Sequence, residues 1–153
     1  LRWLSTRDKP FSDSGETENV KLLATPVEKL SKHLPARSVD AIVTEPYMGP
    51  VSGIRNHESG IRDDLEKLYV RSFREFAKIL KPGGRIVFIL PAFKTPNGLF
   101  KTSDHVLPEI KKLGFTPTQL LPTYYSLPTT YSILYSRPDQ KVLREIFVFE
   151  LKK

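Results

Sequence analysis

The sequence predicts an α/β fold with a mostly parallel sheet and an antiparallel hairpin near its C-terminus. Two observations predict this class. Apolar strand patterns alternate with helical patterns from about residue 19 to residue 121. After residue 121 the pattern becomes rich in strands, with a turn at residues 138–141. The chain has 153 residues, which is the length of one domain.

The first predicted elements are short. Residues 19–24 (NVKLLA) form a strand candidate, and residues 27–34 form a short helix or turn that Pro35 ends. Residues 41–44 form the next strand. Residues 1–4 (LRWL) resemble the last turn of a helix, and residues 5–18 are polar and read as a loop. We therefore expect residues 1–18 to follow a preceding segment, and residues 19–153 to be the C-terminal portion of a domain.

The clearest predicted element is a helix over residues 62–80. Its apolar residues recur every three or four positions, which gives one stripe for a core-facing side. The Pro82-Gly83-Gly84 sequence ends this helix. Residues 85–90 (RIVFIL) are continuously apolar, as in a strand that is covered on both faces. An irregular loop is expected over residues 91–102.

The last third of the chain predicts one helix and several strands. The helix covers residues 103–113, with Ser103 as its N-cap and Gly114 directly after its end. Strands are expected at residues 115–121, 131–135 and 144–151, with a loop at 122–130. The final strand alternates apolar and polar residues, so it belongs to the antiparallel hairpin.

Composition limits the classes of partner and site. The net charge of +7 and the pI of about 9.6 favour a nucleic-acid partner, although many basic domains have none. The chain has no cysteine, which excludes disulfides and thiolate metal sites and favours the cytoplasm. No apolar run reaches the ~20 residues of a membrane span. The three histidines lack metal-ligand spacing, so no metal site is expected.

The stretch VDAIVTEPYMG, residues 39–49, places a carboxylate, a proline and an aromatic ring at the end of a predicted strand. In open α/β sheets, sites lie beyond the C-terminal ends of the strands. Glu45 can accept a hydrogen bond from an exocyclic amine, Pro46 fixes the direction of its carbonyl, and Tyr47 offers a flat face. Such a set can hold a planar base for methylation of its amino group. The alternative is a simple strand exit, with Tyr47 capping the core and Glu45 in solvent.

Four segments together resemble a known family. They are VDAIVTEPYMG, FAKILKPGGRIVF at residues 76–88, LGF at 113–115 and the tail YSRPDQKVLREIFVFE at 135–150. They resemble class I S-adenosylmethionine-dependent methyltransferases, specifically archaeal-type tRNA guanine-N2 methyltransferases and related nucleobase amino-methylases. The resemblance covers residue 19 to the end and implies a Rossmann-like fold, represented from about its third strand onward.

The resemblance implies methyl transfer from S-adenosylmethionine to an exocyclic amine of a nucleobase, guanine N2 in tRNA. Glu45, Pro46 and Tyr47 would be catalytic, although the family usually has Asp-Pro-Pro-Tyr at this place. Two alternatives remain open. One is a DNA amino-methylase, and the other is an inactive methyltransferase-like module that binds RNA or a partner.

The resemblance also implies a cofactor site that this chain matches only in part. Its residues would be Thr25, Pro26 and Val27 together with Thr44 and Glu45. Pro26 stands where the family has an acidic residue, and the family's Gly-rich loop does not occur in the sequence. Either a preceding segment completes the cofactor site, or the module is inactive.

Six residues are candidates for substrate binding: Met48, Arg55, His57, Phe93, Lys94 and Arg137. Arg55 and His57 lie between Gly53 and Gly60. This stretch is either a flap that closes over RNA or an ordinary solvated loop. Phe93 and Lys94 follow the strand at 85–90, so they either contact substrate or form an ordinary surface loop. Arg137 lies near several tyrosines, which either stack on RNA or pack the edge of the sheet.

Overall fold

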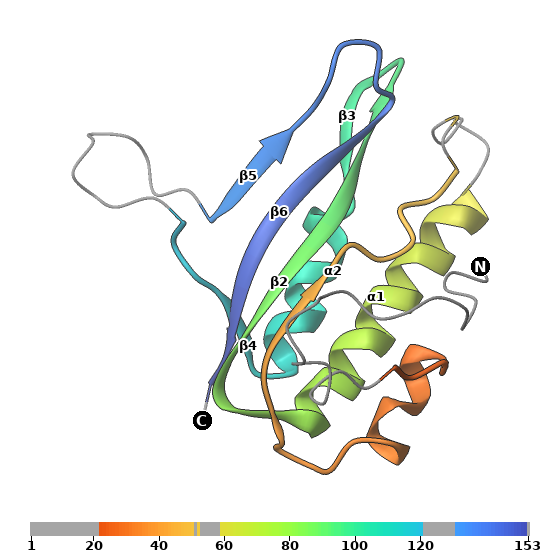
Figure 1. Ribbon diagram of the computed structural model, residues 1–153. Helices are drawn as coiled ribbons and strands as arrows, with labels where there is room; N and C mark the ends of the chain where they lie inside the picture. Colours follow the sequence, from red (N-terminus) through yellow and green to blue (C-terminus); the bar gives the residue numbers. More distant parts are fainter. Residues whose placement is uncertain (1–21, 51, 53–58, 121–130, 153) are drawn as a thin grey trace, which may run out of the picture.

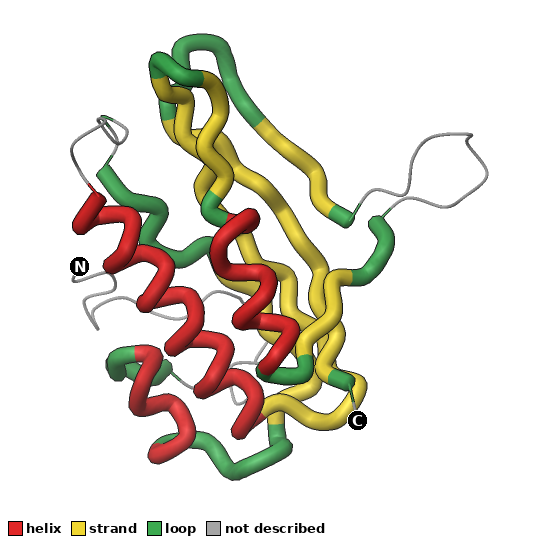
Figure 2. The backbone as a smooth tube through the Cα atoms, turned by 180° about the vertical axis from the view of Figure 1, so that it is seen from behind, coloured by secondary structure: helices red, strands yellow, loops and turns green. Residues whose placement is uncertain are grey.

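The computed structural model describes residues 22–50, 52, 59–120 and 131–152. Within them, a six-stranded sheet carries two α-helices on one face (Figures 1 and 2). The strand order is β1-β2-β6-β4, with β3 paired to β2 and β5 paired to β6. The elements are η2 (Val27–Lys32), β1 (Val39–Thr44), α1 (Ser59–Ile79), β2 (Leu80–Thr95), β3 (Gly98–Lys101), α2 (Ser103–Lys112), β4 (Phe115–Pro117), β5 (Ser132–Tyr135) and β6 (Val142–Leu151).

The sheet is mixed, so the prediction of a mostly parallel sheet is wrong for the described residues. Within them, only β1 and β2 pair in parallel, through the crossover helix α1. The pairs β2–β3, β2–β6, β4–β6 and β5–β6 are antiparallel. A continuous apolar run shows that a strand is covered, but it does not show which way its neighbours run. The predicted C-terminal hairpin is confirmed, because β5 and β6 are antiparallel neighbours.

Strand β2 is much longer than the predicted strand at 85–90. It extends to Thr95, and β3 returns beside it, so most of the expected loop at 91–102 is a hairpin. Thr95 pairs with Gly98, whose φ of 112° suits glycine alone. Pro91 suggests a strand end in the sequence, because proline cannot donate to a ladder. In the structure, Pro91 lies opposite Arg144 of β6, and β3 pairs from Ala92 onward, so the strand continues through Pro91.

Helix α1 supplies the core that packs against the sheet. It runs from Ser59 to Ile79, close to the prediction of 62–80. Phe73 is fully buried, and its ring centroid lies 5.0 Å from that of Phe88 in β2 and 5.1 Å from that of Phe149 in β6. Aromatic pairs of this geometry contribute about 0.5–1.5 kcal/mol each beyond area burial. One helix therefore ties β2 and β6 together.

The shorter elements mostly follow the prediction. A 3-10 helix, η2, replaces the helix or turn expected at 27–34. Residues 22–24, the described part of the strand expected at 19–24, are not in a strand. Thr102, rather than Ser103, occupies the N-cap position of α2. Ser103 instead donates to Glu145, so its hydroxyl serves the tertiary structure.

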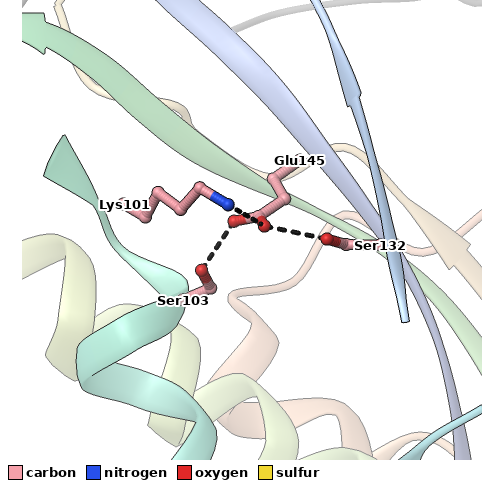
Figure 3. A network of polar contacts seen from close by, with 4 residues as sticks. All are labelled: Lys101, Ser103, Ser132 and Glu145. Atoms are coloured by element: carbon pink, nitrogen blue, oxygen red, sulfur yellow. Dashed lines mark hydrogen bonds and ion pairs between the residues drawn. The ribbon is translucent and has the colours of Figure 1, made fainter. Parts of the chain in front are cut away.

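A buried carboxylate joins β6 to three neighbouring elements (Figure 3). The Glu145 side chain accepts hydrogen bonds from Lys101 Nζ at 3.0 Å, Ser103 Oγ at 2.6 Å and Ser132 Oγ at 2.9 Å. Because these donors come from β3, α2 and β5, the network fixes the position of β6. The preceding residue in the chain, Arg144, points to the other face of the sheet and belongs to the candidate site.

Candidate functional site

The motif leaves the sheet at the C-terminal end of β1. Thr44 is the last residue in register with β2, opposite Phe88, and Glu45 begins the segment beyond the sheet. The segment turns at Gly49, whose φ is +85°. A Cβ there would lie 3.2 Å from Leu65 Cδ1 and 3.4 Å from Phe93 Cζ. Both the backbone conformation and the close packing therefore require glycine at this turn.

Tyr69 of α1 anchors the backbone of the motif. Its hydroxyl donates a 2.7 Å hydrogen bond to the backbone carbonyl of Tyr47. Tyr69 is fully buried, and burial raises the pKa of its phenol well above the ordinary value, with a smaller contribution from Tyr47. The Tyr47 side chain is on the surface, and the residue is 62% exposed. The backbone is thus fixed while the ring remains open to a stacking partner.

Arg144 of β6 holds the carboxylate of the motif. Arg144 Nε donates to Glu45 Oε1 at 2.8 Å, and Nη2 lies 2.7 Å from the same oxygen. Among the described residues, the structure gives no partner to the second oxygen, Oε2. The Glu45 side chain is 41% exposed, so this oxygen can meet a ligand. Arg144 therefore neutralises and orients one side of the carboxylate and leaves the other available.

A cavity of about 400 Å³ adjoins this ion pair. Met48, Gly49 and Ser52 line one side, and residues 139–142 with Arg144 line the other. The second wall comes from the turn between β5 and β6, which the backbone hydrogen bond from Lys94 N to Lys141 O joins to the end of β2. Two cations, Lys141 and Arg144, and one carboxylate, Asp139, lie in its lining.

The structure brings only some of the predicted substrate residues to this cavity. Met48 lines it, and the backbone of Lys94 supports its wall. Phe93 is fully buried under Gly49, so it supports the motif and does not face solvent. Arg137 is exposed, and its Nε donates to the hydroxyl of Tyr135 at 3.1 Å. Arg55 and His57 lie outside the described residues.

The candidate cofactor residues fall into two groups. Thr44 and Glu45 lie at the motif, which Tyr69 of α1 anchors. Thr25, Pro26 and Val27 lie at the start of η2, which packs along the later part of α1 through the 3.0 Å hydrogen bond from Ser31 N to Glu75 Oε2. Positions 69 and 75 are about 9 Å apart along a helix axis, so the two groups contact different parts of α1.

Strand β1 offers one open edge beside the motif. Its other edge is paired with β2, and no further strand of the described chain pairs with it. Val43 of this strand is 78% exposed. The described residues present neither a Gly-rich loop nor a carboxylate set for ribose hydroxyls at this edge. At this edge the described residues do not by themselves form a nucleoside cofactor cradle.

Two other kinds of site receive no support in the described part of the chain. No group of three or more His, Asp or Glu side chains there has metal-binding geometry. None of its helices combines the length and apolar character needed to cross a bilayer.

Sequence reasoning missed the two residues that organise the motif, Arg144 and Tyr69. In the sequence, Arg144 is only one of several basic residues near tyrosines. The available signal is an arginine at the start of an otherwise apolar strand pattern, REIFVFEL. Tyr69 belongs to the predicted apolar stripe of α1, which the structure confirms, but its hydroxyl also needs a buried acceptor.

Comparison with known proteins identifies the fold. No protein-family model matches the chain, and no curated protein matches it significantly. Among solved structures, it resembles TTHA0409, a candidate DNA modification methylase from Thermus thermophilus, with 18% identity and a TM-score of 0.55 over 84% of this chain and 52% of that one. TTHA0409 complexed with S-adenosyl-L-methionine gives 19% identity, a TM-score of 0.55 and coverages of 84% and 54%.

The PvuII DNA methyltransferase, specific for cytosine N4, is also similar, with 12% identity and a TM-score of 0.58 over 84% of this chain and 48% of that one. The chain spans about half the length of these structures. At these identities the likeness concerns the fold. The described sheet and helices therefore have the Rossmann-like fold of class I methyltransferases.

Proposed function

We propose that this chain carries the acceptor side of an S-adenosylmethionine-dependent methyltransferase that modifies an exocyclic amine of a nucleobase. One observation carries the proposal. At the C-terminal end of β1, Arg144 holds one oxygen of Glu45, and the second oxygen has no partner among the described residues. The exposed Tyr47 lies two residues away. The fold and the family resemblance of the motif support the same reaction class.

The roles of the residues follow from their chemistry. Glu45 Oε2 accepts an N–H of the target amine, and the Pro46 carbonyl accepts the other. When both N–H groups are bound to these acceptors, the nitrogen lone pair points away from them. The acceptors also stabilise the positive charge that grows on nitrogen during methylation. Tyr47 stacks on the base, where aromatic stacking contributes about 1–3 kcal/mol. S-adenosylmethionine, when bound, supplies the electrophilic methyl group.

The cofactor requires more than the described residues. The open edge of β1 is the natural place for a further strand, because its backbone groups have no sheet partner in the described part. Our proposal is that a segment beyond the described residues pairs there and completes the cofactor site. The half-length coverage of the similar structures supports this arrangement.

The proposed substrate is tRNA, with guanine N2 as the target, because the motif and the tail resemble that branch of the family. The basic charge of the chain and the cations Lys141 and Arg144 in the cavity suit a polyanion that delivers a base. A second candidate is an amino group in DNA. It is favoured by the fold likeness to the cytosine-N4 enzyme and to TTHA0409.

The test is transfer of a labelled methyl group from S-adenosylmethionine to tRNA and to DNA by the full-length protein. Digestion to nucleosides identifies the product. Glu45→Ala is expected to abolish transfer while the protein stays folded, and the exposed carboxylate variant Glu150→Ala serves as a matched control. Wild-type turnover by Glu45→Ala would contradict the assignment. No transfer by the wild type would favour the inactive binding module.

A further inference from the structure

Helix α1 exposes a row of three cations on the side that faces away from the sheet. Lys67, Arg71 and Arg74 are exposed and follow one another at spacings of four and three residues, which places them on one helix face. No ion pair of the described chain involves any of them, whereas Lys78, one turn later, pairs with Glu75. We call Lys67, Arg71 and Arg74 the cationic ridge.

A groove runs along the cationic ridge. It has a volume of about 380 Å³ and lies between α1 and α2. Besides the ridge, its lining consists of Glu66, Val70, His105, Val106 and Glu109. Glu109 Oε1 lies 2.6 Å from Lys112 Nζ, and Glu66 Oε1 lies 3.7 Å from His105 Nδ1. Neither carboxylate forms an ion pair with the ridge, and the three ridge cations form no ion pair with any other carboxylate of the described residues.

The dimensions of the ridge match a phosphodiester chain. With a rise of 1.5 Å per residue, the three cations span about 10.5 Å along the helix. A nucleic-acid strand advances about 3.4 Å per phosphate along a duplex axis, so the span faces about three phosphates. Arginine and lysine ends are flexible enough to follow either a duplex or a single strand.

We infer that the cationic ridge binds the phosphate backbone of the nucleic acid whose base enters the Glu45 site. The choice of nucleic acid as the partner rests on the proposed function. The charge of the ridge and the spacing of its residues are independent of that function. The ridge begins at Lys67, two residues before Tyr69, which anchors the Tyr47 backbone from another face of the same helix. In this inference the ridge contacts phosphate and not the reacting base.

The test measures binding without methyl transfer. Fluorescence anisotropy of labelled tRNA is followed over a range of salt concentrations, with no S-adenosylmethionine present. The triple variant Lys67→Ala, Arg71→Ala and Arg74→Ala is expected to bind more weakly at low salt. The slope of log K against log salt should fall by about two to three, because each phosphate that is no longer neutralised lowers it by about 0.7–0.9. Alanine favours helix, so α1 should stay folded.

The matched control is Lys29→Ala, Lys32→Ala and Lys152→Ala. It removes the same charge from η2 and from the end of β6, and these three side chains are also exposed and form no ion pair within the described residues. An unchanged slope in the ridge variant, or an equal fall in the control, would overturn the inference. Binding to vesicles containing phosphatidylserine is measured as well. If the ridge variant loses affinity for these vesicles but not for tRNA, the ridge is assigned to a membrane surface instead.

The same samples separate this inference from the proposed function. Methyl transfer and the salt slope are two independent readouts of the same proteins. If the wild type methylates nothing but the ridge variant still loses slope, the ridge stands and the methyl-transfer proposal fails. If methylation requires Glu45 but the ridge variant binds normally, only the ridge fails.

Discussion

Arg144 donates to the carboxylate of Glu45 although 99 positions separate the two residues in the chain. Two nitrogens of the guanidinium, Nε at 2.8 Å and Nη2 at 2.7 Å, converge on a single oxygen. The pair joins the end of β1 to the start of β6 across β2. It also leaves the second oxygen of Glu45 available, which is the condition for the proposed acceptor role.

Arg144→Ala should therefore impair methyl transfer more than folding. Hydrogen bonds to charged groups contribute about 1.5–3 kcal/mol, so a loss of about tenfold to a hundredfold in kcat/KM is expected. Arg144→Lys should recover part of it, because lysine keeps the charge without the planar fork. Steady-state kinetics with both variants checks this, and equal rates for wild type and Arg144→Ala would show that Glu45 needs no positioning.

Tyr69→Phe removes one hydroxyl and keeps the ring that packs on Phe88 at 5.6 Å. The Tyr47 carbonyl then loses its donor, and the motif backbone loses its anchor to α1. The expected cost in unfolding free energy is about 0.5–1.5 kcal/mol. Activity should fall further than this destabilisation explains. Tyr131→Phe, an exposed tyrosine in the same protein, should leave both denaturant midpoint and rate unchanged.

Glu145→Ala should strongly destabilise the position of β6. It leaves Lys101 without its carboxylate and two serine hydroxyls without their acceptor. Breaking a buried pair costs about 3–5 kcal/mol, and the partial exposure of Lys101 places the expected loss near the lower end. Urea unfolding measures it. Glu150→Ala, whose partner Arg85 lies at 4.0 Å on the surface, should change stability by less than about 0.5 kcal/mol.

Gly84→Ala should destabilise the β1–β2 pairing. A Cβ at this position would lie 2.7 Å from Leu80 Cγ, 2.8 Å from the Lys81 carbonyl oxygen and 3.0 Å from the Asp40 carbonyl oxygen. Two of these contacts are with backbone, so the strands must move apart, at an expected cost of about 1–3 kcal/mol. Gly60→Ala meets nothing within 4 Å in the first turn of α1 and should not destabilise. Thermal unfolding of the two variants gives the comparison.

Glu75 makes acid stability depend on the contact between η2 and α1. The hydrogen bond from Lys78 and that from the Ser31 amide lower the pKa of Glu75 against the opposing effect of burial. A lowered folded-state pKa stabilises the fold above the unfolded value of 4.5, and the effect is lost as pH falls through the folded-state pKa. Glu75→Gln should therefore unfold with a weaker pH dependence below pH 4.5. Parallel pH profiles for variant and wild type would contradict this.

The elements with strong local periodicity were predictable from the amino-acid sequence. The apolar stripe of α1 belongs to this group, because its burial repeats with the period of the helix. The strand β1 was predicted from its short apolar run. The chemistry of the Glu45-Pro46-Tyr47 motif was also readable, because these residues are adjacent in the chain and lie at a strand end.

The direction of the strands, the length of β2 and the partner of Glu45 became visible only in the folded chain. Each depends on which segments lie side by side, and residues distant in sequence carry no periodic signal of their neighbours. Lys141 and Arg144 line one cavity, whose wall the Lys94 backbone supports, because β2 and β6 pair along most of their shared length. The proposed acceptor site therefore forms only once β6 has paired with β2 beside the motif.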